Sequence, residues 1–403
     1  RDKFIKSLSS SGLNRNHAEQ LSKETVRNIT ILRRRLKLDF TPPLWAKAEN
    51  IRDLIPAILI GRWNDKVEGD RNIVARIAGE SYNRYSEKLQ RWVNSDDTPL
   101  VNVDGIWRII SPYESFCYAS NYFTANDFTN YRSVVFEIAA DNDPDANEKL
   151  NATTIQFWEN KQCYSGWLKE GIFQSAILIS IIGKSTELCT PQQPADMWVD
   201  SIIRDILNDS TIEWWFSNGR ILSQIAEASP RCYIKYLIDD LKKEDSIIKR
   251  LFIPKANISF MGPGENYTNV LWSLRTLLWE EEFFLPVSLI LMELSAIENN
   301  TNSADKPFET LCAAYTIWHP QTYVNTNQRL QTLRTLCHKY PIQGFSLCKH
   351  LVDRLDRSVI FPTKPMHWRR FEQERPKVTN EDIYESIGSI CQLMVDVCNF
   401  STS

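Results

Sequence analysis

The chain has 403 residues, of which 43% are hydrophobic and 24% charged, and this composition excludes a globally disordered protein. Lysine and arginine total 47 against 50 aspartate and glutamate, so the formal net charge is only -3 and a generally basic nucleic-acid binder is disfavoured. Only 13 glycines occur, which disfavours glycine-rich nucleotide folds and predicts a mainly helical protein.

Both the chain start and the cysteines indicate a cytoplasmic protein. The sequence starts with Arg1, has no signal-peptide pattern and has no apolar run long enough to span a bilayer. We therefore expect no membrane contact and interpret the chain as a piece of a longer or processed protein. The nine cysteines are scattered without a CxxC pair, and we expect reduced thiols on apolar faces, as at Cys232, Cys312 and Cys391.

Residues 1–45 are predicted to form a short helical unit. Asn14 is a plausible N-cap, and apolar residues repeat at helical spacing from position 29 to 36. Arg33, Arg34 and Arg35 lie within that repeat, so at least one of them can point at a partner. A solvated surface is the alternative interpretation of these arginines.

Residues 46–115 are predicted to form a winged-helix domain. Helical spacing marks three helices, around 51–59, 73–77 and 82–93. Alternating apolar residues then flank Asp104-Gly105, which is a strong hairpin signal because glycine accepts a positive φ. Three helices followed by a hairpin is the order of a winged helix.

Residues 116–360 are predicted to form an irregular α-helical repeat array. Amphipathic segments and short breaks alternate in units of 30 to 45 residues, and such units usually stack as an α solenoid. Residues 361–403 are predicted to be a linker and a C-terminal helix near 382–397. The expected fold class is therefore mainly α, a winged helix with a small β hairpin followed by helical repeats.

Several short motifs resemble nucleotide, metal or acidic sites, but a structural role explains each of them better. Gly183-Lys184-Ser185 lacks the upstream glycine of a phosphate loop, and we interpret Gly183 as a helix C-cap. The pairs Cys337-His338 and Cys348-x-His350 fall on predicted helices, so we expect buried cysteines and surface histidines rather than zinc ligands. The run Glu280–Glu282 is expected to be a solvated helix end. No convergent catalytic set can be named, so no enzyme, metal or cofactor is expected in this chain.

DNA binding by the winged helix is the weaker alternative. Its third helix carries Arg84, Lys88 and Arg91, but Glu80 and Glu87 lie among them. Neutralisation of phosphates dominates DNA affinity, so such scattered cations favour protein packing. A transcription regulator with a helical sensing domain stays the alternative function.

Several stretches resemble the region that follows the ATPase core of bacterial STAND NTPases, including the Avs-like antiviral sensors. The likeness extends over most of residues 1–355 and is carried by short motifs: Ile29 to Leu36, Leu54 to Trp63, Val103 to Arg108, Leu271 to Trp279, Lys306 to Phe308, Trp318 to Thr322, and Arg329.

The resemblance implies a regulatory and ligand-sensing part of an antiphage defence protein. The array would bind a protein ligand, plausibly a phage protein, and the full-length protein would self-assemble. ATP and Mg would bind a domain upstream of Arg1, and one of Arg33, Arg34 and Arg35 would sense the nucleotide.

Overall fold

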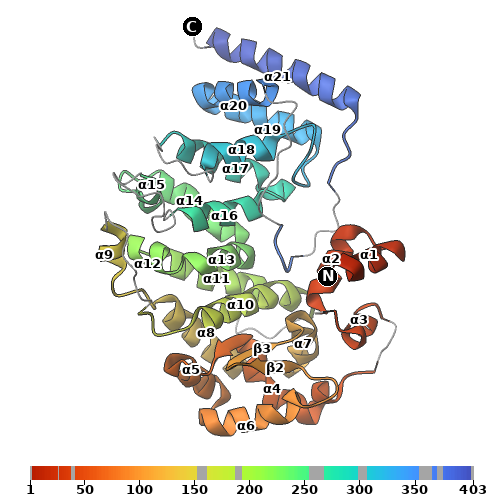
Figure 1. Cartoon of the computed structure of the whole chain (residues 1–403). Coiled ribbons are helices and arrows are strands. Elements are labelled where there is room, and N and C mark those ends of the chain that lie inside the picture. Colours follow the sequence, from red (N-terminus) through yellow and green to blue (C-terminus); the bar gives the residue numbers. More distant parts are fainter. Residues whose placement is uncertain are drawn as a thin grey trace. The chain divides into compact units, whose positions relative to one another are not determined.

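A computed structural model describes residues 2–25, 27–37, 41–151, 161–186, 193–253, 267–297, 306–353, 365–369 and 375–400. The described part is mainly helical, with one small antiparallel sheet, as the sequence predicts (Figure 1). It divides into two compact units, Arg1–Asn147 with Trp158–Cys232, and Glu148–Phe157 with Tyr233–Ser403. The four-part division made from the sequence is finer than these two units and stays a prediction.

The first unit begins with three short helices that share a small core. These are α1 (Asp2–Ser10), α2 (Arg15–Glu24) and α3 (Ile29–Arg35). The Asn14 side chain accepts a hydrogen bond from the His17 amide, which confirms the predicted N-cap. The helices close over a buried apolar cluster, formed by Ile5, Leu8, Ala18, Leu21 and Leu32.

Residues 48–109 form a helix–sheet segment. Its elements are α4 (Ala48–Ile60), β1 (Arg62–Asn64), α5 (Glu68–Ala78), α6 (Tyr82–Val93), β2 (Leu100–Val103) and β3 (Ile106–Ile109), preceded by the 3-10 turn η1 (Leu44–Ala46). The three helices and the hairpin agree with the sequence, but β1 is an addition. The strand order is β1-β3-β2, both pairs are antiparallel, and Trp63 lies opposite Trp107. The two indole rings stack with centroids 5.5 Å apart, which fixes the register of this three-residue strand.

The hairpin turn has the backbone that its sequence predicts. Asp104 has a φ of 52° and Gly105 a φ of 84°. Positive φ at both central positions is the hallmark of the type I′ turn, whose twist matches that of the flanking strands.

The rest of the first unit is helical and packs around one long helix, α10 (Gly166–Thr186). Gly171 allows the close approach of α10 to the junction of α4 and β1, because a Cβ there would lie 2.4 Å from the Ile60 carbonyl oxygen and 2.7 Å from the Arg62 nitrogen. The other elements are α7 (Pro112–Ala119), η2 (Ser120–Tyr122), α8 (Ala125–Ala139), α9 (Ala146–Asn151), α11 (Ala195–Asn208), α12 (Ile212–Ser217), η3 (Gly219–Ile221) and α13 (Leu222–Ala228). Helix α9 spans one boundary between the two units in the sequence. Helix α14 (Pro230–Leu241), which follows α13, spans another.

The second unit is a succession of helices, several of which pack on the next helix along the chain (Figure 1). They are α15 (Ile247–Phe252), α16 (Thr268–Leu277), α17 (Glu281–Ser295), α18 (Pro307–Tyr315), α19 (Thr326–Lys339), α20 (Pro341–Asp353) and α21 (Asn380–Phe400). The last helix confirms the predicted C-terminal helix, whereas residues 361–364 and 370–374 of the predicted linker lie outside the described residues.

Three expectations are wrong in detail. Gly183 is not a C-cap, because α10 continues to Thr186 and buries Gly183 inside the helix. Cys391 is exposed rather than on an apolar face. Glu280 is buried rather than solvated, although Glu281 and Glu282 are exposed as expected. Within the described ranges, no helix is both long and apolar enough to cross a bilayer.

Candidate functional site

Helix α3 separates the three predicted site arginines by pointing them in different directions. Asn28 caps the helix by accepting hydrogen bonds from the Thr30 and Ile31 amides. Consecutive helical residues are about 100° apart around the axis, so adjacent side chains cannot share one face. Arg33 is exposed, whereas Arg34 and Arg35 are partly buried.

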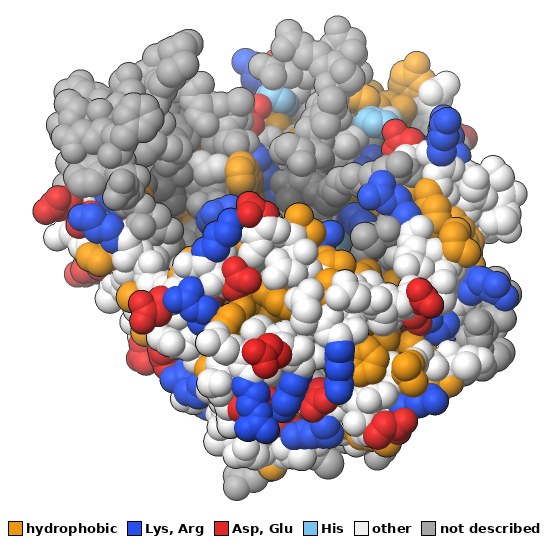
Figure 2. Space-filling view, turned by 60° about the horizontal axis from the view of Figure 1, so that its bottom comes forward, with side chains coloured by type: hydrophobic (Ala, Val, Ile, Leu, Met, Phe, Trp, Pro, Cys, Tyr) orange, Lys and Arg blue, Asp and Glu red, His pale blue; other side chains and the backbone are white. Residues whose placement is uncertain are grey.

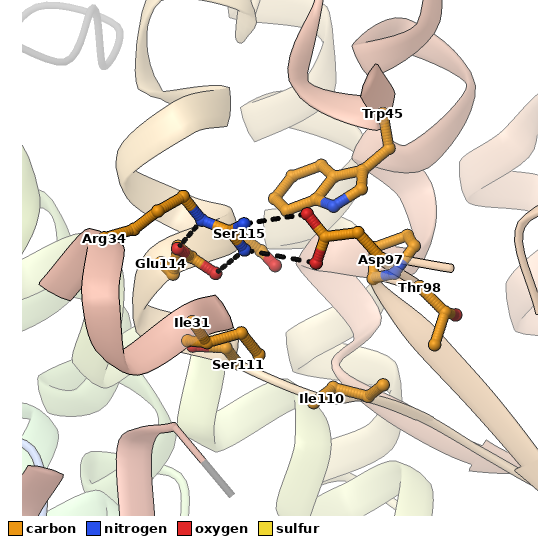
Figure 3. A pocket seen from close by; sticks show the side chains of 10 residues that line it. Ile31, Arg34, Trp45, Asp97, Thr98, Ile110, Ser111, Glu114 and Ser115 are labelled. Atoms are coloured by element: carbon orange, nitrogen blue, oxygen red, sulfur yellow. Dashed lines mark hydrogen bonds and ion pairs between the residues drawn. The ribbon is translucent and has the colours of Figure 1, made fainter. Parts of the chain in front are cut away.

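Arg34 is held between two carboxylates (Figure 3). Its Nε donates to Glu114 Oε1 at 2.7 Å and its Nη1 donates to Asp97 Oδ2 at 2.7 Å. Nη2 adds longer bonds to Glu114 Oε2 at 3.2 Å and to Asp97 Oδ1 at 3.3 Å. The planar guanidinium therefore engages both oxygens of both acids, which is the strongest geometry available to an arginine. We call Arg34, Asp97 and Glu114 the arginine latch.

The latch ties the N-terminal helices to the helix–sheet segment and to α7. Glu114 lies in the first turn of α7, and Asp97 lies in the loop between α6 and β2. The side chains of Arg34 and Glu114 are only 6% and 5% exposed, whereas that of Asp97 is 29% exposed. The Arg34–Glu114 pair is thus largely removed from water, where a charge without its partner is costly.

Burial and ion pairing have opposite effects on the pKa values of Arg34 and Glu114. Burial disfavours the charge on Arg34, but the hydrogen bonds that Arg34 donates to Glu114 and Asp97 outweigh this effect and raise the pKa of Arg34. Burial also raises the pKa of Glu114, and Arg34 only partly offsets that rise. The latch therefore depends on all three groups remaining together.

Arg35 makes a second connection next to the latch. Its guanidinium forms an ion pair of 2.7 Å with the buried Glu24 of α2 and lies 4.4 Å from the ring centroid of Tyr113. The first contact fixes α3 to α2, and the second fixes it to α7.

Polar atoms without hydrogen-bond partners line the pocket around the latch. They are Trp45 Nε1, Ser111 Oγ and Ser115 Oγ, all three buried, and Figure 3 shows the three residues around Arg34 and Asp97. Unsatisfied buried donors carry a desolvation cost of about 1–3 kcal/mol each. These three atoms lie in the lining of the pocket beside Arg34 and Asp97.

The sequence singled out the arginines but not their partners. Asp97 and Glu114 lie 63 and 80 residues from Arg34, and no local pattern distinguishes them from other surface acids. Of the three arginines, Arg33 is the exposed one, so it is the one open to an external anion. Nucleotide sensing by Arg33, Arg34 or Arg35 stays a prediction.

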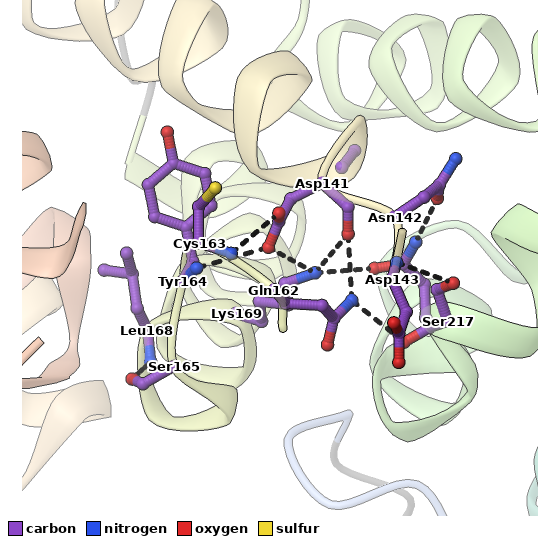
Figure 4. A network of polar contacts seen from close by, with 12 residues as sticks. Asp141, Asn142, Asp143, Gln162, Cys163, Tyr164, Ser165, Leu168, Lys169 and Ser217 are labelled. Atoms are coloured by element: carbon purple, nitrogen blue, oxygen red, sulfur yellow. Dashed lines mark hydrogen bonds and ion pairs between the residues drawn. The ribbon is translucent and has the colours of Figure 1, made fainter. Parts of the chain in front are cut away.

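A second polar cluster stabilises the start of α10 (Figure 4). Lys169 Nζ donates to the main-chain oxygen of Asp141 at 2.7 Å and to Asn218 Oδ1 at 3.1 Å, and forms an ion pair of 3.1 Å with Asp141 Oδ2. Burial lowers the pKa of Lys169, against the opposing charge of Asp141. All three donors of the ammonium group are engaged, so Lys169 is a structural tie and not a free nucleophile.

A buried carboxylate completes this cluster. Asp70 accepts from the Ser165 amide at 2.9 Å, the Ser165 hydroxyl at 2.5 Å and the Asn64 amide at 2.8 Å. Burial raises the pKa of Asp70, and these hydrogen bonds lower it. The arrangement joins α5, β1 and the N-terminus of α10, and its role is structural.

The cations of α6 are paired within the molecule. Lys88 and Arg84 both form ion pairs with Glu80, at 2.6 and 3.2 Å, and Arg91 pairs with Asp53 at 2.5 Å. Figure 2 brings this end of the molecule forward and shows Lys and Arg interspersed with Asp and Glu. Cations that are paired with acids in this way favour protein packing over the neutralisation of phosphates.

The remaining motifs do not form a metal site. Cys337 and Cys348 are buried on α19 and α20, His338 is exposed, and His350 is half-buried. Across the residues that the structure describes, no group of three or more His, Cys, Asp or Glu is arranged to hold a metal ion.

No family model, curated protein or solved structure matches this chain.

Proposed function

We propose that this chain is a regulatory, protein-binding module of a STAND-type NTPase, in which a helical lid is latched to a winged helix and followed by a helical sensor array. The observation that carries the proposal is the arginine latch, Arg34 held by Asp97 and Glu114. A buried, bidentate ion pair between two parts of a chain can hold one geometry and release it when a competitor takes either partner.

The winged-helix interpretation rests on topology. The helix–sheet segment has the order helix, strand, helix, helix, strand, strand, and β3 lies between β1 and β2. With β1 the sheet has three antiparallel strands, a number that is compatible with a winged helix and supports this interpretation. The paired cations on α6 favour protein packing over DNA reading.

The sensor interpretation rests on the helices after this segment. Sequential helices pack on one another, and several carry exposed large apolar side chains, among them Met197 on α11, Trp272 on α16 and Ile342 on α20. Stacked helical repeats commonly bind proteins, and exposed aromatic and methionine side chains are enriched at such interfaces. We infer that the ligand is a protein, with a phage protein as the first candidate.

The test is phage restriction by the native reading frame that contains this chain. The full-length protein is expressed in a bacterial host and challenged with a panel of phages, and phages that escape are sequenced. We expect escape mutations to converge on one phage protein, and the purified chain to bind the original form of that protein but not the escape form in calorimetry.

A matched pair of variants tests the latch. Arg34→Met should give activity without phage, measured as slowed host growth, whereas Arg33→Met should not, because Arg33 is exposed. Absence of restriction across the panel would argue against the proposal. So would tight binding of the chain to duplex DNA that weakens steeply with salt, which is the behaviour of a transcription regulator.

A further inference from the structure

Two cysteines lie against each other inside the second unit. Cys337 is near the end of α19, and Cys348 is on α20, the next helix. Their sulfur atoms are 3.5 Å apart, within sulfur hydrogen-bonding range, and the two residues are only 2% and 0% exposed. The two helices form a hairpin that turns at Tyr340, so the pair joins its arms.

Gly344 explains how the helices come this close. A Cβ at position 344 would lie 2.6 Å from the Cα of Cys337 and 3.0 Å from its sulfur. Only glycine therefore lets the backbone of α20 rest against Cys337. The close approach places the Cys348 sulfur within reach of its partner.

We propose that Cys337 and Cys348 are a redox site, which a hydroperoxide converts into a reversible disulfide. The proposal is independent of the STAND-type function and of any ligand of the array. A disulfide bond is about 2.0 Å long, so the sulfurs must approach by about 1.5 Å. Disulfides are rare in a reducing compartment, and those that do form there are usually transient and reversible.

The pair is polarised for this reaction. The contact between the two sulfurs lowers the pKa of Cys337 and raises the pKa of Cys348. The thiolate is the nucleophile in thiol oxidation. We assign Cys337 as the attacking sulfur and Cys348 as the resolving one, because their 3.5 Å separation lets the second sulfur reach the first.

The reaction balances in two steps. The Cys337 thiolate attacks one oxygen of hydrogen peroxide, the O–O bond breaks, hydroxide leaves, and Cys337 becomes a sulfenic acid. The Cys348 sulfur then attacks the Cys337 sulfur, the S–O bond breaks, and a second hydroxide leaves. The protons of the two thiols convert both hydroxides to water, so two thiols lose two electrons and one peroxide gains them. A dithiol reductant reverses the change.

The experiment maps the bond directly in the whole chain. Reduced protein is treated with hydrogen peroxide, quenched with catalase, denatured, alkylated with iodoacetamide and digested with trypsin. Cleavage after Arg334, Lys339 and Lys349 separates the cysteines into peptides 335–339 and 340–349. We expect these two peptides to be linked, with a mass lower by two hydrogen atoms than their sum, and to separate after treatment with dithiothreitol.

Variants distinguish this pair from the exposed thiols of α21. Cys391→Ser should keep the linked peptide, because Cys391 is exposed and is not part of the pair. Cys348→Ser should abolish it and leave Cys337 as a sulfenic acid that dimedone traps.

Two results would overturn the proposal, and both come from the unaltered protein. One is full alkylation of Cys337 and Cys348 at a peroxide dose that oxidises the exposed Cys391. The other is a link from either buried cysteine to Cys391 in place of the link between them.

Discussion

Arg34 in the first unit and Arg329 in the second are both buried arginines, but their partners differ in kind. Arg34 is neutralised by the carboxylates of Asp97 and Glu114. Arg329 donates to the main-chain oxygens of Ala314, Thr322 and Val324 and to the Thr322 hydroxyl, and lies 5.6 Å from the ring centroid of Phe284. Burial lowers the pKa of Arg329 to about 10, whereas pairing raises that of Arg34.

The kind of partner determines whether a contact of the arginine can be exchanged. A carboxylate partner can be replaced by another anion or taken by another cation, so the geometry of the arginine latch is compatible with the regulatory role that we propose. Main-chain oxygens cannot be exchanged without unfolding the loop that carries them. We therefore expect Arg329 to hold the connection between α18 and α19, and Arg34 to hold one of two alternative geometries.

The largest effect is expected from Arg329→Met. The substitution leaves three buried carbonyl oxygens and a hydroxyl without their donor, and we expect it to destabilise the second unit by about 4 kcal/mol. Urea unfolding of the chain, with hydrogen exchange of segment 314–324, measures the loss. Arg329→Lys is the control and should lose less, because an ammonium group still supplies three donors. A loss under about 1 kcal/mol for Arg329→Met would contradict the comparison.

Breaking the latch with Arg34→Met should have the next largest effect. It leaves the buried Glu114 without a cation, and we expect a loss of about 3 kcal/mol in the first unit, seen as a lower urea midpoint. Arg33→Met should change stability by less than about 0.5 kcal/mol, because Arg33 is exposed. Equal effects of the two variants would show that the latch does not stabilise this geometry.

A buried carboxylate in the second unit extends the comparison to pH. Glu280 is 4% exposed, its Oε1 has no hydrogen-bond partner, and burial, with help from Glu282 and against Arg369, raises its pKa to about 8. An acid whose folded pKa exceeds its unfolded value stabilises the fold at low pH. That stability is lost as the pH rises through the folded pKa.

We therefore expect the stability of the second unit to fall by about 2 kcal/mol between pH 6 and pH 8. Thermal or urea unfolding across this range measures the slope. Glu280→Gln should flatten the profile, because the amide does not titrate. An unchanged slope in Glu280→Gln would assign the pH dependence to other groups.

The smallest effect is expected at the exposed ion pairs of α6. Arg91→Ala and Lys88→Ala each remove one partner of a surface pair, and we expect losses of at most about 0.5 kcal/mol. Duplex DNA binding, measured by fluorescence anisotropy in low and high salt, should be equally weak for both variants and the parent chain. A large, salt-dependent loss of affinity in either variant would restore the DNA-reading alternative.

Helices and the hairpin were accessible to sequence reasoning because their signals are local. The apolar spacing of 82–93 matches α6, and Asp104-Gly105 provides the two positive φ values of the turn between β2 and β3. By contrast, β1 has three residues and no alternation of its own. It exists because Trp63 stacks on Trp107, more than forty positions away.

For the candidate site, too, some features could be predicted from the sequence and others depended on the tertiary structure. From the sequence alone, the arginine cluster was identified as three adjacent cations on a helix that also bears an apolar stripe. Only the tertiary structure decided that Arg34 meets Asp97 and Glu114, that Arg33 faces solvent, and that Glu280 is buried while its neighbours are not. Periodicity and turn chemistry depend on residues a few positions apart, whereas burial and charge pairing depend on which distant segments pack together.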